Sequence, residues 1–157
     1  MSEPIVIRPA TSTDSEAVAD VYLAAFHATY DFPLAHTDER VRAWLRDIEI
    51  PRGDTWVATI GEAVVGMTVV RSGELDQLYV TPAAQGLGVG RQLVDLAKRL
   101  SPDALGLYTF QVNERARRFY ERQGFIADGF GDGTGNEERQ PDVHYTWRRG
   151  AETEQPG

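Results

Sequence analysis

Three glycines within five residues mark the part of this chain that is best suited to hold an anion. Gly86, Gly88 and Gly90 follow an expected strand and open an expected helix. Glycine lets backbone N–H groups approach a ligand closely, and the N-terminus of a helix adds a partial positive charge. The sequence therefore predicts a phosphate or diphosphate site in residues 85–90, and a tight turn without a ligand is the alternative.

Two common phosphate-binding loops do not fit this segment. A P-loop requires lysine and then serine or threonine after its last glycine, but Arg91 and Gln92 follow Gly90. The dinucleotide fingerprint Gly-x-Gly-x-x-Gly requires glycine at position 91 or 93, and these positions hold Arg91 and Leu93. A nucleotide-phosphate binder is thus disfavoured, and a different diphosphate ligand is favoured.

Two carboxylates precede the glycines on the expected strand of residues 74–80. Alternate side chains of a strand share a face, so Glu74 and Asp76 lie on the same face as Leu78. A carboxylate there can act as a general base. The histidines lie on different expected elements without the spacing of a zinc site, so we expect no metal.

The hydrophobic pattern predicts the elements that position these residues. Runs of β-branched residues predict strands, and 3.6-residue periodicity predicts helices. The helices are expected to start at a capping box in residues 13–16, near Val41, after the glycine loop of residues 86–90 and at Asn113. The expected strands cover residues 6–9, 55–60, 63–70, 74–80, 105–112, 125–130 and 143–147. The order βααβββαβαββ predicts a mixed α/β (α+β) fold, with a mostly antiparallel sheet of about seven strands and about four helices.

Composition narrows the class of protein further. The 157 residues include no cysteine, which excludes disulfides, thiolate metal sites and a cysteine nucleophile on this chain. The net charge of −8 disfavours nucleic acid as a partner. Residues 91–122 nevertheless hold seven basic and four acidic residues, which suits an anionic ligand.

The same composition predicts where the protein works and how it is organised. No apolar run approaches the roughly 20 residues that span a bilayer, and residues 1–4 lack a basic-then-apolar signal. We therefore expect a cytoplasmic protein that does not bind membranes. Residues 1–149 are expected to form a single domain and residues 150–157 a disordered tail.

Two segments resemble signatures of the GNAT N-acetyltransferase superfamily. Residues 85–90 fit the pattern Arg/Gln-x-x-Gly-x-Gly/Ala, and residues 113–125 are similar to the family's Asn-x-x-Ala-x-x-Phe-Tyr-x-x-x-Gly-Phe segment. Residues 7–11 and 141–145 are also similar to many small members. The resemblance covers nearly the whole chain and implies a GNAT-like N-acetyltransferase domain that uses acetyl-CoA.

The resemblance also implies residue roles. The backbone amides of the glycine loop would hold the CoA pyrophosphate, and the Val80 amide would polarise the thioester carbonyl. Tyr120 would protonate the departing thiolate, and Glu74 would act as base, with Asp76 or water as alternatives. The implied acetyl-CoA-binding residues are Leu78, Tyr79, Val80, Gln85, Gly86, Leu87, Gly88, Val89, Gly90, Arg91, Asn113, Ala116, Phe119 and Tyr120. The implied substrate-binding residues are Phe26, His27, Tyr30 and Trp44.

The implied acceptor is a primary amine of a small molecule or a peptide. Without cysteine, transfer is expected to occur by direct attack in a ternary complex. A non-catalytic acyl-CoA-binding or sensing domain is the alternative. A homodimer is among the assemblies that the sequence allows.

Overall fold

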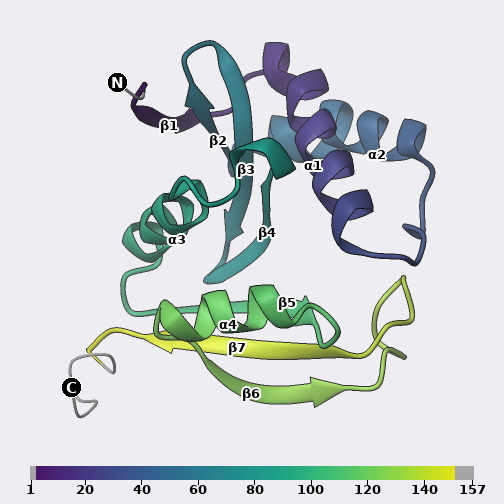
Figure 1. Ribbon diagram of the computed structural model, residues 1–157, viewed down its shortest axis with the longest axis vertical. Coiled ribbons are helices and arrows are strands. Elements are labelled where there is room, and N and C mark those ends of the chain that lie inside the picture. The colour runs from purple at the N-terminus through teal and green to yellow at the C-terminus, as the bar shows by residue number, and fades with distance from the viewer. Residues whose placement is uncertain (1–2, 151–157) are drawn as a thin grey trace. The chain divides into compact units, whose positions relative to one another are not determined.

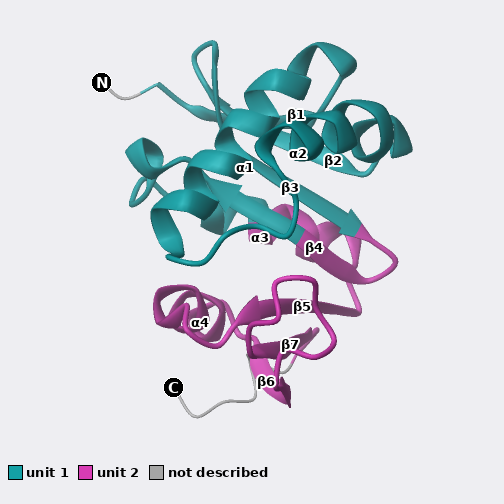
Figure 2. Ribbon diagram, turned by 90° about the vertical axis from the view of Figure 1, so that its right-hand side faces the viewer, with its two compact units in different colours: residues 1–70, 77–93 teal, residues 71–76, 94–157 magenta. Residues whose placement is uncertain are grey.

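The computed structural model describes residues 3–150, and the chain divides into two compact units (Figure 2). Within the described residues, unit 1 comprises residues 3–70 and 77–93, and unit 2 comprises residues 71–76 and 94–150. Residues 151–157 of the expected tail lie outside the described residues. The single domain of residues 1–149 stays a prediction.

The observed order of helices and strands confirms the predicted α/β class (Figure 1). The elements are β1 (Ile5–Pro9), α1 (Ser15–Thr29), α2 (Asp38–Trp44), β2 (Thr55–Ile60), β3 (Ala63–Arg71), β4 (Glu74–Val80), α3 (Val89–Leu100), β5 (Ala104–Phe110), α4 (Glu114–Arg122), β6 (Ile126–Gly131) and β7 (Asp142–Arg148). None of the helices within residues 3–150 has the length and apolar character that a membrane crossing requires.

The strands form a seven-stranded mixed sheet in the order β1-β2-β3-β4-β5-β7-β6. The pairs β1–β2, β2–β3, β5–β7 and β6–β7 are antiparallel. β4 and β5 are parallel and pair at Glu74 and Gly106, both of which belong to unit 2. β7, the last strand within residues 3–150, lies between β5 and β6, which precede it in the sequence.

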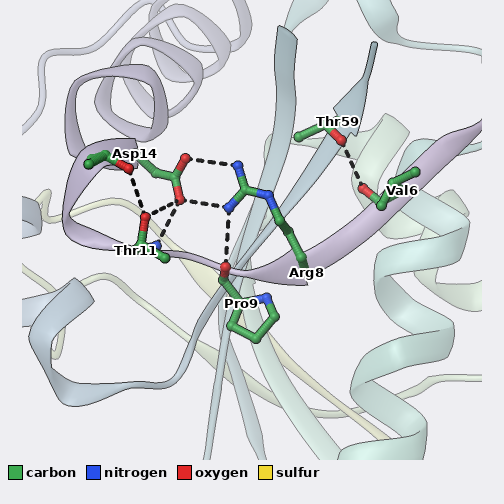
Figure 3. Close-up of polar contacts among 7 residues, drawn as sticks. Val6, Arg8, Pro9, Thr11, Asp14 and Thr59 are labelled. Carbon is green, nitrogen blue, oxygen red and sulfur yellow. Dashed lines mark hydrogen bonds and ion pairs between the residues drawn. The ribbon is translucent and has the colours of Figure 1, made fainter. Parts of the chain in front are cut away.

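The first long helix of unit 1 begins one residue later than the capping box of residues 13–16 predicts. The structure has a capping box at Thr11 and Asp14, followed by a 3-10 turn, and α1 starts at Ser15. The Asp14 carboxylate accepts hydrogen bonds from the Arg8 guanidinium at 2.8 and 3.0 Å and from the Thr11 backbone N–H at 2.7 Å (Figure 3). These bonds hold the pKa of Asp14 at about 2, with the Arg8 hydrogen bond as the largest cause.

The second helix of unit 1 differs from the predicted regular helix. Val41 and Leu45 are buried as the periodicity predicts, but Ile48 is 47% exposed. The cause is a π-helical turn at Leu45–Glu49, which follows α2 directly. A π turn contains more residues than an α turn, so it rotates Ile48 away from the face that Val41 and Leu45 occupy.

In unit 2, β7 presents different chemistry on its two faces. Val143, Tyr145 and Trp147 are buried, whereas His144 and Thr146 between them are partly exposed. α4 lies along β5 and β7 (Figure 1), and Arg117 of α4 donates a hydrogen bond from Nε to the Tyr145 hydroxyl at 3.1 Å. The opposite face of β7 therefore remains available for polar side chains.

Candidate active site

Two of the three glycines in the glycine loop of unit 1 have a left-handed backbone. Gly86 and Gly88 have φ angles of +85° and +88°, which L-residues with a side chain rarely adopt. A Cβ atom at either position would have no heavy atom within 4 Å. α3 begins at Val89, so the first amides of this helix have no acceptor within it. The loop thus combines open space with backbone donors, which fits a diphosphate group.

Packing within unit 1 holds the loop beside the end of β4. A Cβ atom at Gly66 of β3 would lie 2.9 Å from Cγ1 of Val89 and 3.4 Å from the Tyr79 carbonyl oxygen. Glycine at this position therefore lets the first turn of α3 approach β3 closely. The Gln85 side chain also donates a hydrogen bond to the Val80 carbonyl at 3.4 Å. Both contacts link the glycine loop to the end of β4, whose residues 78–80 are among the expected acetyl-CoA-binding residues.

The end of β4 is partly exposed and stays attached to β3. Leu78, Tyr79 and Val80 are neither fully buried nor fully exposed. The Thr81 backbone N–H donates to the Val65 carbonyl at 2.8 Å, and the Tyr79 ring packs 4.6 Å from the Tyr22 ring of α1. One edge of this strand segment is thereby fixed by unit 1 itself.

The start of β4 belongs to unit 2 and brings Glu74 to a histidine. Oε1 of Glu74 lies 3.3 Å from Nε2 of His144. Nδ1 of His144 lies 2.7 Å from Oδ1 of Asp128, and the Thr146 hydroxyl donates to Oδ2 of Asp128 at 2.6 Å. We call Glu74, Asp128, His144 and Thr146 the His144 cluster. Asp76, the alternative base, instead pairs with Arg71 at 3.3 Å.

The His144 cluster perturbs two pKa values. Burial opposes a charge on His144, but the hydrogen bonds and charges of Asp128 and Glu74 outweigh it and raise the pKa of the imidazole. Hydrogen bonds from Thr146 and then His144 lower the pKa of Asp128. Asp128 is therefore a carboxylate at neutral pH, and it favours a proton on Nδ1 of His144.

Sequence reasoning missed His144 and Asp128. His144 is 70 residues from Glu74, and no local pattern links them. Asp128 sits at a register shift between Ala127 and Gly129, where β6 bulges against β7. The one signal in the sequence was the alternation of polar and apolar residues in residues 143–147, which places His144 and Thr146 on one face.

α4 of unit 2 carries the predicted proton donor. The Asn113 side chain accepts a hydrogen bond from the Ala116 backbone N–H at 3.0 Å, which confirms Asn113 as the N-cap. Tyr120 is 7% exposed, and its ring lies 5.2 Å from Phe119 and 5.7 Å from Phe125. This ring is therefore fixed by packing.

The predicted acceptor residues lie in unit 1. Phe26 is 2% exposed and packs 4.8 Å from the Tyr30 ring. His27 is exposed, and its Nε2 lies 3.2 Å from Oδ1 of Asp38. Trp44 is partly buried, 6.3 Å from the Tyr22 ring. Their contact with an acceptor stays a prediction.

The predicted site residues thus form two sets. Unit 1 holds the glycine loop with Arg91, the end of β4 and the aromatic residues of α1 and α2, and unit 2 holds Glu74, Asp76 and the α4 residues. The grouping of both sets around one ligand stays a prediction. Among residues 3–150, no group of three or more His, Asp or Glu side chains is arranged to bind a metal ion.

Comparisons with known proteins point to one family. Residues 51–127 match the family model described as acetyltransferase (GNAT) domain. The chain is 29% identical to the peptidyl-lysine N-acetyltransferase YjaB of Escherichia coli (strain K12), over 80% of this chain and 84% of that protein. It is 25% identical to the peptidyl-lysine N-acetyltransferase YiaC of the same organism, over 76% of this chain and 82% of that protein.

Solved structures agree with these sequence matches. The solution structure of apo-form YjaB from Escherichia coli superposes with a TM-score of 0.77 at 26% identity, over 92% of this chain and 97% of that chain. The PaiA N-acetyltransferase of Thermoplasma acidophilum, solved in complex with coenzyme A, has the same fold, with a TM-score of 0.69 at 21% identity. That match covers 92% of this chain and 99% of that chain.

Proposed function

Because this chain belongs to the GNAT acetyltransferase superfamily and is an acetyl-CoA-dependent N-acetyltransferase, we propose that its acceptor is a primary amine of a peptide or a small molecule. Two similar proteins are peptidyl-lysine N-acetyltransferases, which supports a lysine side chain as the first acceptor to test. The observation that carries the proposal is the pair of open, positive-φ glycines, Gly86 and Gly88, at the start of α3.

The proposal assigns the glycine loop to the pyrophosphate of acetyl-CoA. Backbone N–H groups of residues 86–90 would donate to its oxygens, and the partial positive charge of the α3 N-terminus would favour its negative charge. Arg91 is exposed one residue further along α3 and adds a positive charge. The end of β4 would pair with the pantetheine arm as an added strand does.

The chemical steps are assigned to residues of both units. Acetyl-CoA supplies an acyl thioester, which the acceptor amine attacks directly. A lysine amine has a pKa near 10.4, so a base must remove a proton before it attacks, and Glu74 is proposed for this. The Val80 N–H would polarise the acyl carbonyl. Tyr120 is proposed to donate its hydroxyl proton to the departing sulfur.

The test of this function is release of free CoA across a panel of amines. The panel contains a lysine peptide with a blocked N-terminus, the same peptide with arginine in place of lysine, and simple alkyl amines. We expect CoA release and a mass increase of one acetyl group on the lysine peptide or on an alkyl amine, and none on the arginine peptide. Tight CoA binding without turnover of any amine would refute the proposal.

A further inference from the structure

His144 is held by three separate features of unit 2 on the polar face of β7. First, β6 contains a bulge at Asp128, since Ala127 pairs with Tyr145 and Gly129 pairs with His144. Bulges re-aim side chains and are frequent near active sites. Here the bulge lets Oδ1 of Asp128 approach Nδ1 of His144 to 2.7 Å.

Second, a glycine makes room for the contact between Glu74 and His144. Gly106 of β5 pairs with Glu74 on one side and with Thr146 on the other. A Cβ atom at Gly106 would clash with Oε1 of Glu74 and would lie 2.9 Å from Nε2 of His144. Any larger residue would therefore separate the carboxylate from the imidazole.

Third, an aromatic ring packs against the imidazole at a steep angle. Tyr108 pairs with His144 across β5 and β7, and the two ring centroids lie 4.6 Å apart. The titratable groups that face His144 within the described residues are thus Glu74 from β4, Tyr108 from β5 and Asp128 from β6. The side chain of His144 is 22% exposed and that of Glu74 is 39% exposed. Glu74 is therefore the member of this pair that is more open to an incoming molecule.

We propose that Glu74 and His144 act as one proton-accepting pair, in which Glu74 meets the acceptor amine and His144 stores its proton, while Asp128 positions the imidazole. This inference rests on the proposed function. With Nδ1–H donated to Asp128, the lone pair of Nε2 faces the Glu74 carboxylate. Two anionic groups around a neutral imidazole favour uptake of a proton between Nε2 and Oε1.

The pair also suits the reaction better than a carboxylate alone. An ordinary Glu has a pKa about 6 units below that of a lysine amine, whereas an ordinary His lies about 4 units below it. The imidazole of His144, with its raised pKa, narrows this gap further. The equilibrium constant for proton transfer from the ammonium group is therefore at least about 10²-fold larger with His144 as the proton acceptor than with an ordinary carboxylate.

The proton balance is as follows in the proposed step. One N–H bond of the acceptor ammonium breaks, and its proton passes through Oε1 of Glu74 to Nε2 of His144. The freed lone pair forms the bond between nitrogen and the acyl carbon, and the C–S bond breaks with its electron pair on sulfur. The sulfur takes up the hydroxyl proton of Tyr120. The nitrogen, which is positively charged after the attack, releases its second proton to solvent, and the Tyr120 oxygen regains a proton from solvent. His144 then returns its proton to the solvent.

The experiment compares wild type with His144→Gln, Asp128→Asn and the control His36→Gln, an exposed histidine of unit 1. We expect the kcat of wild type and of the control to fall below an inflection above pH 6.5, where His144 is already protonated. Asp128→Asn removes one carboxylate that favours the imidazolium, so the inflection moves to lower pH. His144→Gln should lose the inflection and about 10- to 100-fold in kcat.

A second readout does not depend on activity. In the NMR titration of the free protein, one imidazole signal should titrate with a midpoint above pH 6.5. This signal should be absent in His144→Gln, and its midpoint should move to lower pH in Asp128→Asn. Asp128→Asn keeps the size of the side chain and preserves the test if His144→Gln does not fold. If both variants acetylate an amine and their kcat shows the same inflection as wild type, the proton-accepting pair is refuted, whereas the proposed acetyltransferase function is not. Absence of acetylation with every amine would overturn both.

Discussion

Replacement of Gly88 by alanine separates ligand binding at the glycine loop from backbone strain. Gly88 has a φ of +88°, so an alanine there costs about 1–2 kcal/mol of stability. The Cβ atom meets nothing within 4 Å in the free protein, so strain is the main expected cost. For a chain of this length, that cost lowers the melting temperature by about 2–8 °C.

Gly53 provides the matched control for this variant. It has a φ of +87°, belongs to the same unit and also has no heavy atom within 4 Å of a Cβ position. Gly53→Ala should therefore lose as much stability as Gly88→Ala. It lies outside the predicted binding residues, so CoA should stabilise it as strongly as wild type.

The assay is a thermal-unfolding titration with CoA and with acetyl-CoA. At 100 times its Kd, a ligand stabilises the folded state by about 2.7 kcal/mol, which raises the melting temperature of wild type by about 5–11 °C. A methyl group in the space for the pyrophosphate should raise the Kd of Gly88→Ala at least tenfold, which removes about 1.4 kcal/mol of that stabilisation. The reasoning is refuted if Gly88→Ala loses stability as Gly53→Ala does, yet binds CoA with the wild-type Kd.

Three further predictions concern α4 and the start of α1. Tyr120→Phe should lower kcat about 10²-fold with little change in melting temperature, because its ring packing remains; a kcat within about twofold of wild type would make the hydroxyl structural. Asn113→Ala removes the N-cap of α4 and should lower the free energy of unfolding, measured by chemical denaturation, by about 1 kcal/mol. Thr37→Ala at the α2 cap is the matched control and should cost as much. A loss of stability in Thr37→Ala without one in Asn113→Ala would contradict the capping role of Asn113. Asp14 has a folded pKa of about 2, below its usual 3.8, so it adds about 2 kcal/mol of stability above pH 4 that is lost as the pH falls through 2. Unfolding free energies should therefore show the gap between wild type and Asp14→Asn closing over that range, and a constant gap would count against the Arg8 pairing.

Local patterns in the sequence were sufficient to predict the order of helices and strands and to locate the glycine loop between a strand and a helix. The bounds predicted for residues 74–80 agree with β4, because Pro82 and the glycines that follow end that strand. The left-handed backbone at Gly86 and Gly88 is also a local property of glycine. These features depend on neighbours a few residues away, which a single sequence displays.

The His144 cluster depends instead on pairing between distant strands. His144 meets Glu74 only because β7 pairs with β5, and Asp128 reaches it only through the bulge in β6. Neither the insertion of β7 between β5 and β6 nor a one-residue register shift has a signal in the hydrophobic pattern. The exposure of Ile48 has a similar origin, since a π turn disrupts the periodicity from which its burial was predicted.

The insertion of β7 between β5 and β6 has a consequence for synthesis on the ribosome. β5 and β6 are made first, and in the finished sheet both pair with β7. Without β7, both strands present unpaired N–H and C=O groups, which are templates for aggregation. A chain that is terminated and released before residue 142 would therefore expose two unpaired strand edges and would lack His144, so premature termination should yield aggregates rather than a weakened enzyme.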